Sequence, residues 1–192
     1  MKQLNNVTKF IFLLIVLPLI VASCDPEKEF ETELDDLELQ LAHVDSLESL
    51  FDGIDFDSLT IMVDHVKANE AEIKRLYTPD TLNEEFGRWM NDCKAIRKNL
   101  GNIGKDQGIY GDELNAVKHQ LLDLKEDVKS GVLKKDQVTE YLGVEKAALD
   151  KVSLSFGSFY GMISAERYRY YVVVPKVNDF IEELKAKNDQ LD

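Results

Sequence analysis

Cys24 is the residue whose surroundings point most clearly to chemistry. The stretch VASCDPEKEFE, residues 21–31, is small and apolar up to this cysteine and strongly acidic after it. A single thiol at such a boundary is a candidate point of covalent attachment. The residues that precede it indicate what the attachment is for.

The first residues of the chain have the parts of a secretory signal. They carry Lys2 and Lys9 but no acid, and an apolar run then extends from Phe10 to Ala22. This order is typical of signal peptides. The apolar run is thirteen residues long and contains Pro18, whereas a membrane-spanning helix needs about 20 residues. An uncleaved transmembrane anchor is therefore the weaker alternative.

The tetrad Val21-Ala22-Ser23-Cys24 resembles the lipobox of bacterial lipoproteins. The resemblance implies that Val21, Ala22 and Ser23 are recognised by the signal peptidase, that cleavage precedes Cys24, and that this cysteine is acylated. Two or three acyl chains hold a soluble domain stably on a membrane, whereas one chain binds only marginally. An ordinary signal peptide with a chance cysteine is the alternative.

The same resemblance implies a location in the bacterial cell envelope, outside the cytoplasm. In some Gram-negative lipoproteins an aspartate in the place of Asp25 favours retention in the inner membrane. In others, acidic stretches like residues 27–33 are similar to export tags. Of these addresses we favour the outer membrane or the cell surface over the inner membrane.

No other pattern predicts catalysis or a cofactor. The aspartates of DGIDFDS, residues 52–58, lack the glycine and glutamate positions of an EF-hand loop, and GNIGKDQG, residues 101–108, lacks the Ser/Thr of a phosphate loop. None of the three histidines has another histidine, a cysteine or a paired carboxylate three or four residues on in a recognised ligand motif; they are His43, His65 and His119. Cys93 lies in an apolar seam and is interpreted as a core residue. We predict no catalytic residue, no metal and no cofactor.

The densest aromatic stretch is FGSFYGMISAERYRYY, residues 156–171. Its Gly157 and Gly161 are four residues apart, and small residues at this spacing let another helix approach closely. Tyrosine and arginine are enriched in the hot spots of interfaces. The candidate partner surface consists of Tyr160, Tyr168, Arg169 and Tyr171. Packing of this stretch into the core is the alternative.

Apolar residues recur at alternating steps of three and four, which predicts helices packed along a seam. The pattern runs through five segments, which are residues 30–51, 56–77, 82–103, 114–128 and 138–184. Short turns make successive helices antiparallel neighbours. The sequence therefore predicts an all-α fold, an antiparallel helical bundle or a set of coiled-coil-like hairpins, with five to six helices.

Capping residues predict where these helices begin. Asp55 or Asp57 caps the second segment after the turn at Gly53. The box Thr81-x-x-Glu84 opens the third segment. Asp136 caps the last segment.

Glycine and proline predict where helices end or break. Gly131 stops the fourth segment, and four glycines mark an irregular stretch before it, at positions 101, 104, 108 and 111. Pro175 lies inside the last seam, where proline kinks or breaks a helix. We favour a kink or a restart there, with a short extended connector as a further alternative.

Charge and length complete the organisation. Residues 1–23 form the signal, residues 24–33 the lipidated cysteine with an acidic tether, and residues 34–192 a single helical-bundle domain. Residues 25–57 hold thirteen acids, one lysine and one histidine, whereas residues 58–192 hold 23 acids and 20 basic residues. This balance argues against nucleic acid, which attracts the opposite charge. Cys93 is left without a disulfide partner once Cys24 is lipidated.

The sequence favours a lipid-anchored envelope protein with a non-catalytic binding or scaffolding role. Acyl chains on Cys24 attach it to the membrane, and a protein of the envelope is its expected partner. One alternative is an acidic binder or inhibitor of a cationic protein at the envelope. The other is a small-ligand-binding protein or an enzyme, with a site assembled between helices.

Overall fold

The computed structural model describes residues 26–77 and 83–189. Within these ranges every regular element is an α-helix, which confirms the predicted all-α class. The elements in chain order are α2 (Pro26–Glu29), α3 (Glu31–Asp52), α4 (Phe56–Leu76), α5 (Glu84–Leu100), α6 (Ile103–Ser130) and α7 (Lys135–Asn188).

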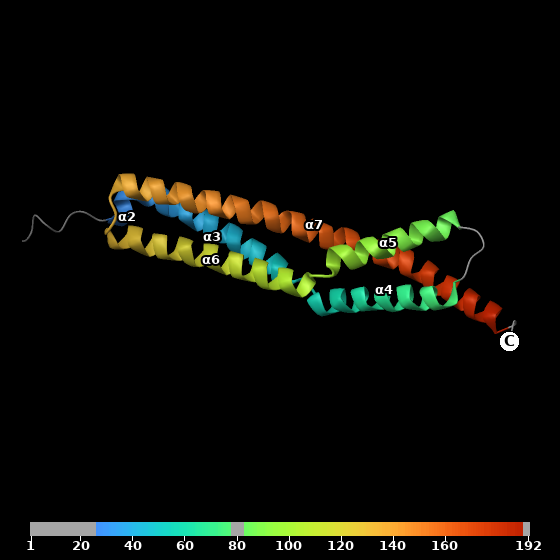
Figure 1. Cartoon of the computed structure of the whole chain (residues 1–192). Coiled ribbons are helices and arrows are strands. Elements are labelled where there is room, and N and C mark those ends of the chain that lie inside the picture. Colours follow the sequence, from blue (N-terminus) through green and yellow to red (C-terminus); the bar gives the residue numbers. More distant parts are fainter. Residues whose placement is uncertain (1–25, 78–82, 190–192) are drawn as a thin grey trace, which may run out of the picture.

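The helices form an elongated rod of three side-by-side rows, which we call stacks (Figure 1). The first stack is α3 followed by α4, the second is α5 followed by α6, and the third is α7 alone. α3 and α4 follow one another in one direction, α5 and α6 return, and α7 runs along both pairs. α3 packs on α6 and α7, while α4 packs on α5 and α7. The molecule therefore consists of two three-helix bundles joined end to end, with α7 common to both.

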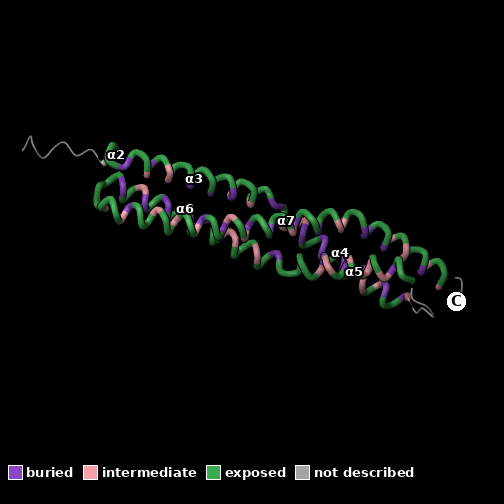
Figure 2. The backbone as a smooth tube through the Cα atoms, turned by 90° about the horizontal axis from the view of Figure 1, so that it is seen from above, coloured by how far each residue is buried: buried purple, intermediate pink, exposed green. Residues whose placement is uncertain are grey.

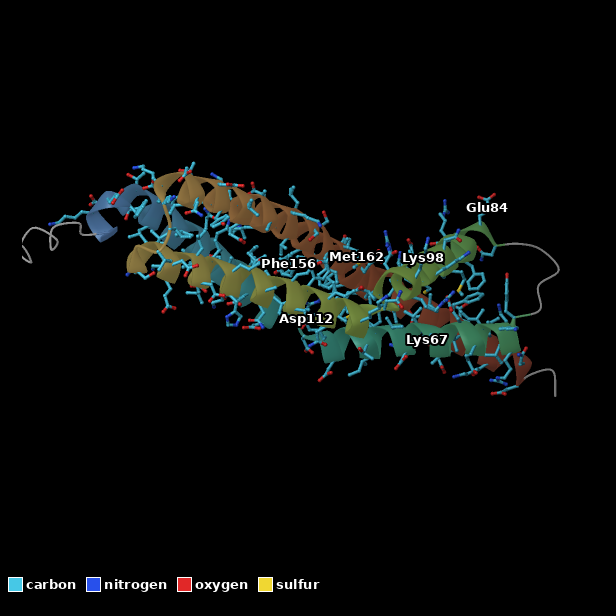
Figure 3. The ribbon with its side chains drawn as sticks, turned by 60° about the vertical axis from the view of Figure 1, so that its left-hand side comes forward. Lys67, Glu84, Lys98, Asp112, Phe156 and Met162 are labelled. Atoms are coloured by element: carbon cyan, nitrogen blue, oxygen red, sulfur yellow. The ribbon has the colours of Figure 1, made fainter. Side chains whose placement is uncertain are left out.

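Aromatic residues fill the joint between the two bundles, which we call the waist. Phe156 of α7 is almost fully buried there, with its ring centroid 6.2 Å from that of Phe51 and 5.9 Å from that of Tyr110. Figure 3 shows Phe156 on the side of α7 that faces α6. Tyr110 also stacks on Phe159 at 4.4 Å. These rings lie where the first stack breaks between α3 and α4 and the second breaks between α5 and α6.

The seam of α7 is buried or half-buried from Val138 to Leu184 (Figure 2), as the apolar spacing predicts. Its buried residues are Val138, Leu149, Val152, Phe156, Phe159, Ile163, Glu166, Val173, Val174, Val177, Ile181 and Leu184. A stripe that recurs at three- and four-residue steps keeps one face of a helix toward its neighbours. This stripe aligns the other helices along α7.

Pro175 does not interrupt α7, so the predicted restart and the extended connector are wrong. Proline lacks a backbone donor and crowds the carbonyl four residues earlier, which here belongs to the exposed Tyr171. Val173, Val174 and Val177 are buried on the opposite side. Their packing holds the helix together across the missing hydrogen bond, and α7 bends gently as one element (Figure 1).

The predicted irregular stretch before the fourth segment is also wrong, because α6 already begins at Ile103. Gly104, Gly108 and Gly111 lie inside this helix. Ile103 is buried, and a Cβ atom on Gly111 would lie only 3.4 Å from Cζ of Phe51. Tertiary packing overrides the weak helix propensity of glycine here.

The helix ends confirm some of the predicted caps and correct others. Asp55 accepts a hydrogen bond from Ser58 N, and Gly131 ends α6 at φ 69°, both as predicted. The cap of α5 is Asn83, whose side chain accepts from two amides of the first turn, so Glu84 is the first residue of this helix and not the third as the predicted box requires; Thr81 itself lies outside the described residues. α7 is capped at Lys134, whose backbone amide donates to Gln137, and Asp136 lies in the first turn.

The folded part begins earlier than the predicted start at residue 34. α2 covers Pro26–Glu29, and Phe30 is buried in the core. The carbonyl of Phe30 accepts a hydrogen bond from Leu34 N, which continues the chain into α3. Within the range 24–33, Pro26–Glu29 and the first residues of α3 are helical.

Gln40 is the one buried side chain of α3 that the fold does not satisfy. It is only 6% exposed, and neither its amide nitrogen nor its carbonyl oxygen has a hydrogen-bond partner. We predict that Gln40→Leu raises the free energy of unfolding by about 1–3 kcal/mol, because it removes an unpaired polar group from the core. Urea unfolding followed by circular dichroism measures this change.

The exposed Gln120 of α6 provides the matched control. Gln120→Leu is expected to change stability by less than about 0.5 kcal/mol, as surface substitutions usually do. A loss of stability in Gln40→Leu would show that the Gln40 amide makes a favourable contact in the folded protein.

Candidate interaction surface on α7

The residues of the predicted lipobox, Val21 to Cys24, lie outside the described part of the chain. Among the described residues, no helix has both the length and the apolar content needed to cross a membrane. The candidate partner surface on α7, in contrast, is fully described.

The outer face of α7 carries an uncharged strip between Leu154 and Pro175, which we call the α7 strip. Its members are all exposed: Leu154, Gly157, Ser158, Gly161, Ser164, Ala165, Tyr168, Tyr171, Val172 and Pro175. At 3.6 residues per turn they fall within an arc of about 140°. The arc lies opposite Phe156, Phe159 and Ile163, which are buried. Nearly a third of all residues in the chain are charged, so an exposed face of ten residues without charge is unusual for this protein.

Large side chains project from this strip into solvent. Leu154 is 75% exposed, Tyr168 73% and Tyr171 61%. Tyr160 is also exposed but lies at the edge of the strip, next to Arg167, the one exposed charged residue between positions 152 and 175. Exposed apolar and aromatic side chains gathered on one face are a common feature of interaction sites. Tyr168 and Tyr171 thus lie where a partner can reach them.

Arg169 has a different environment from the three tyrosines. Its guanidinium donates to the carboxylate of Glu166 at 2.5 Å and lies 3.3 Å from the carboxylate of Asp92 in α5. Glu166 is only 3% exposed and also accepts a hydrogen bond from Asn99 at 2.7 Å. Buried charges are stable only when they are paired in this way. Arg169 therefore ties α7 to α5, which fixes the orientation of the strip.

Two further polar contacts fix the same orientation, and neither is visible in the sequence pattern. Tyr170 lies 2.6 Å from His65 of α4, hydroxyl oxygen to Nδ1. The buried Asn69 donates to Asn178 at 2.7 Å. Both pairs join α4 to α7, so rotation of α7 about its axis would break them.

The fold gives no reason for the glycines of the strip. A Cβ atom on Gly157 or Gly161 would meet nothing within 4 Å. Glycine inside a helix is less stable than alanine by about 0.5–1 kcal/mol. The two residues lower the stability of α7 without relieving any contact in the described structure, and they leave its outer surface flat.

The acidic face of α3 is partly neutralised by lysines of α6. Lys118 lies 2.8 Å from Asp45 and 2.6 Å from Glu48, and Lys125 lies 3.0 Å from Glu38. The hydrogen bond from Lys125 lowers the pKa of Glu38, and the hydrogen bonds to Asp45 and Glu48 raise the pKa of Lys118. These pairs draw the acids of α3 into contacts within the rod and leave fewer of them for a cationic partner.

A cleft of about 400 Å³ lies between α6 and α7. Apolar residues form much of its wall, and Tyr110 hydrogen-bonds the carbonyl of Ser155 at 3.4 Å. Burial raises the pKa of Tyr110, and Glu113 and Asp106 raise it further. The lining contains neither histidine nor cysteine, so a nucleophile activated by imidazole is not present in this cleft.

Histidines elsewhere make polar contacts that the sequence did not predict. Ser153 Oγ lies 3.2 Å from Nε2 of His43. A catalytic triad needs a carboxylate to orient the imidazole, and none hydrogen-bonds His43 among the described residues. The described ranges also contain no cluster of three His, Cys, Asp or Glu residues that could hold a metal ion.

Comparison with known proteins identifies no relative: no family model, curated protein or solved structure matches this chain.

The two glycines of the strip give a test of its surroundings. We predict that Gly157→Ala and Gly161→Ala each raise the free energy of unfolding by about 0.5–1 kcal/mol, because alanine is the better helix former. Thermal unfolding at low protein concentration measures the effect. Gly111→Ala is the control and should gain less, since its Cβ meets Phe51. Destabilisation by the first two substitutions would mean that other atoms occupy the space outside α7.

Cys93 gives a test of the packing between α4, α5 and α7. Its thiol is buried, and burial raises its pKa to about 11, with smaller contributions from Glu70 and Asp92. At pH 8 only about one thiol in a thousand is then ionised, and the thiolate is the reactive form. In a Cys24→Ser background, we predict that Ellman's reagent labels Cys93 at least about 100-fold more slowly in the folded than in the urea-unfolded protein. Equal rates would contradict the buried site.

Proposed function

We propose that this protein is a lipid-anchored, non-catalytic binding or scaffolding protein of the bacterial cell envelope. In this proposal acyl chains on Cys24 attach the protein to a membrane, and we favour the outer membrane or the cell surface over the inner membrane. The α7 strip binds a protein partner. The observation that carries the proposal is the uncharged, exposed strip with Leu154, Tyr168 and Tyr171 on an otherwise highly charged chain.

The shape of the molecule supports a scaffolding role. The described helices begin at Pro26, so only Asp25 separates an acylated Cys24 from the rod. α7 has 54 residues, which corresponds to a length of about 80 Å. The strip begins nineteen residues into this helix, so it lies about 30–60 Å along the rod from the anchored end. A rigid rod of this kind holds a binding surface at a defined distance from its attachment.

The arrangement of charges favours this proposal over the acidic-binder alternative. Lysines of α6 already pair with acids of α3, as Lys118 does with Asp45 and Glu48. Surface pairs of this kind add little stability, but they reduce the field that would attract a cationic partner. The α7 strip has no such internal partners.

In-cell crosslinking of the tagged full-length protein, followed by mass spectrometry, tests the proposal. We predict that Tyr168→Ala combined with Tyr171→Ala reduces recovery of the specific partner at least about 10-fold, since interface tyrosines commonly contribute more than 1 kcal/mol each. Both side chains are exposed, so the double substitution should leave the unfolding temperature nearly unchanged.

Two controls make the result specific. Tyr141→Ala removes a half-exposed tyrosine of the same helix outside the strip and should leave recovery unchanged. Cys24→Ser should abolish acylation and release the protein from the membrane. A partner recovered equally well with and without Tyr168 and Tyr171 would contradict binding through the strip, and unchanged membrane attachment of Cys24→Ser would contradict the lipid anchor.

A further inference from the structure

We propose that the partner of the α7 strip is a second copy of this chain, bound antiparallel along α7. This inference rests on the proposed function, because it names the occupant of the same surface. Three properties of the strip carry it: the absence of charge, the way its side chains match one another in size, and the distribution of charge along the rod.

The absence of charge permits self-association of an acidic protein. The chain has a formal net charge of −13, and two copies that met through charged faces would repel one another. The α7 strip carries no ionisable side chain except the two tyrosines, which are neutral near pH 7. It extends from Leu154 to Pro175, about 30 Å along the helix, so two copies can meet there without placing like charges opposite one another.

The order of side chains along the strip matches itself when one copy is reversed. Six residues of the strip follow alternating four- and three-residue steps, as in a coiled-coil seam: Leu154, Ser158, Gly161, Ala165, Tyr168 and Val172. Antiparallel pairing about position 163 places Leu154 opposite Val172, Ser158 opposite Tyr168 and Gly161 opposite Ala165. The largest side chain then faces a small one, and the closest approach falls at the glycine.

The flanking positions do not oppose one another directly. In the same register Tyr171, at the flank of the strip, lies level with Ser155 of the other copy, about half a turn from Gly157. Parallel pairing would instead oppose Tyr168 to Tyr168 and Gly161 to Gly161, which alternates crowded and empty layers. Well-packed interfaces match large with small, so the sequence of the strip favours the antiparallel arrangement. This pairing also gives Gly161 the close contact that it lacks within one chain.

The distribution of charge along the rod favours the same direction. Thirteen of the acids lie in residues 25–57, whereas residues 58–192 are nearly balanced. α3, which carries most of the acidic segment, lies beside the first half of α7 (Figure 1). Antiparallel pairing places these acidic ends at opposite ends of the dimer, whereas parallel pairing would place them side by side. The first turns of the two α7 helices then lie about 80 Å apart, so anchors at both N-terminal ends would orient the pair along the membrane surface.

One helix pair of this length buries less than the roughly 800 Å² per partner of a standard stable interface. The test therefore uses the full-length protein in its membrane, where anchoring raises the local concentration. Two differently tagged copies, one with Leu154→Cys and one with Val172→Cys, are expressed together, and the membranes are oxidised with copper phenanthroline. We expect a disulfide between the two tags, because close helices bring Cα atoms within the 4.4–6.8 Å that a disulfide requires.

The native cysteines do not interfere with this assay, since Cys93 is buried and Cys24 is acylated under the proposed function. Val144→Cys with Glu182→Cys is the matched control, because these exposed residues would lie at equal heights in the same register but outside the strip. Leu154 and Val172 are exposed, so their substitution should leave folding intact.

Disulfides from Leu154→Cys to itself and from Val172→Cys to itself, without the mixed product, would overturn the antiparallel register. A mixed product no stronger than the control would overturn self-association. In that second case the proposed function stands if another protein is still captured in a manner that depends on Tyr168 and Tyr171, and it fails if none is.

Gly161→Glu gives an independent measurement of the same interface. The new side chain meets no atom within 4 Å of its Cβ in one chain and replaces glycine by a better helix former, so the monomer should remain folded. It places a carboxylate at the centre of the proposed contact. We expect it to reduce the mixed disulfide at least about 10-fold, and an unchanged yield would contradict the close approach at Gly161.

Discussion

The continuous burial of one face of α7 is the constraint on which the rest of this structure depends. Buried residues recur along the helix from Val138 to Leu184, and each of the long helices α3 to α6 packs against this face. The other stacks are interrupted near the waist, but α7 is not. Because every three- or four-residue step must keep the same face inward, the opposite face is just as strictly determined, and it is this outer face that remains without a partner.

The waist shows how two short bundles become one rod. The first stack is interrupted between α3 and α4, and the second between α5 and α6. The rings of Phe51, Tyr110 and Phe156 meet at this level, and aromatic pairs of this kind add about 0.5–1.5 kcal/mol beyond their buried area. Further along, Glu166 with Arg169 and Asn99 joins α5 to α7. Apolar packing thus holds the joint, while polar contacts set the rotation of α7.

Local pattern predicted the parts of the fold that depend on one segment at a time. The seam of α7, the cap at Asp55 and the stop at Gly131 follow from spacing and from single residues, and the structure contains them. The helical glycines of α6 and the uninterrupted passage through Pro175 could not be predicted in this way. Both depend on contacts with other helices, which override local propensity.

The candidate surface was predictable to a similar extent. Tyr168 and Tyr171 are out of phase with the seam, and the phase alone indicates that they are exposed, as they are. Arg169 is also out of phase, yet it is bound by Asp92 from α5, a contact that no spacing within α7 reveals. The last turn of the strip, Tyr171 to Pro175, could be placed only once α7 was known to be continuous, because the sequence predicted a kink or restart in this segment.

Site-specific photocrosslinking measures most directly whether the outer face of α7 binds another protein. A photoreactive phenylalanine analogue replaces Tyr168 in one strain and Tyr141 in another, and whole cells are irradiated. We predict a discrete crosslinked product of higher mass from position 168 and little or none from position 141, which lies outside the strip. No product at position 168, or equal products at both positions, would contradict it.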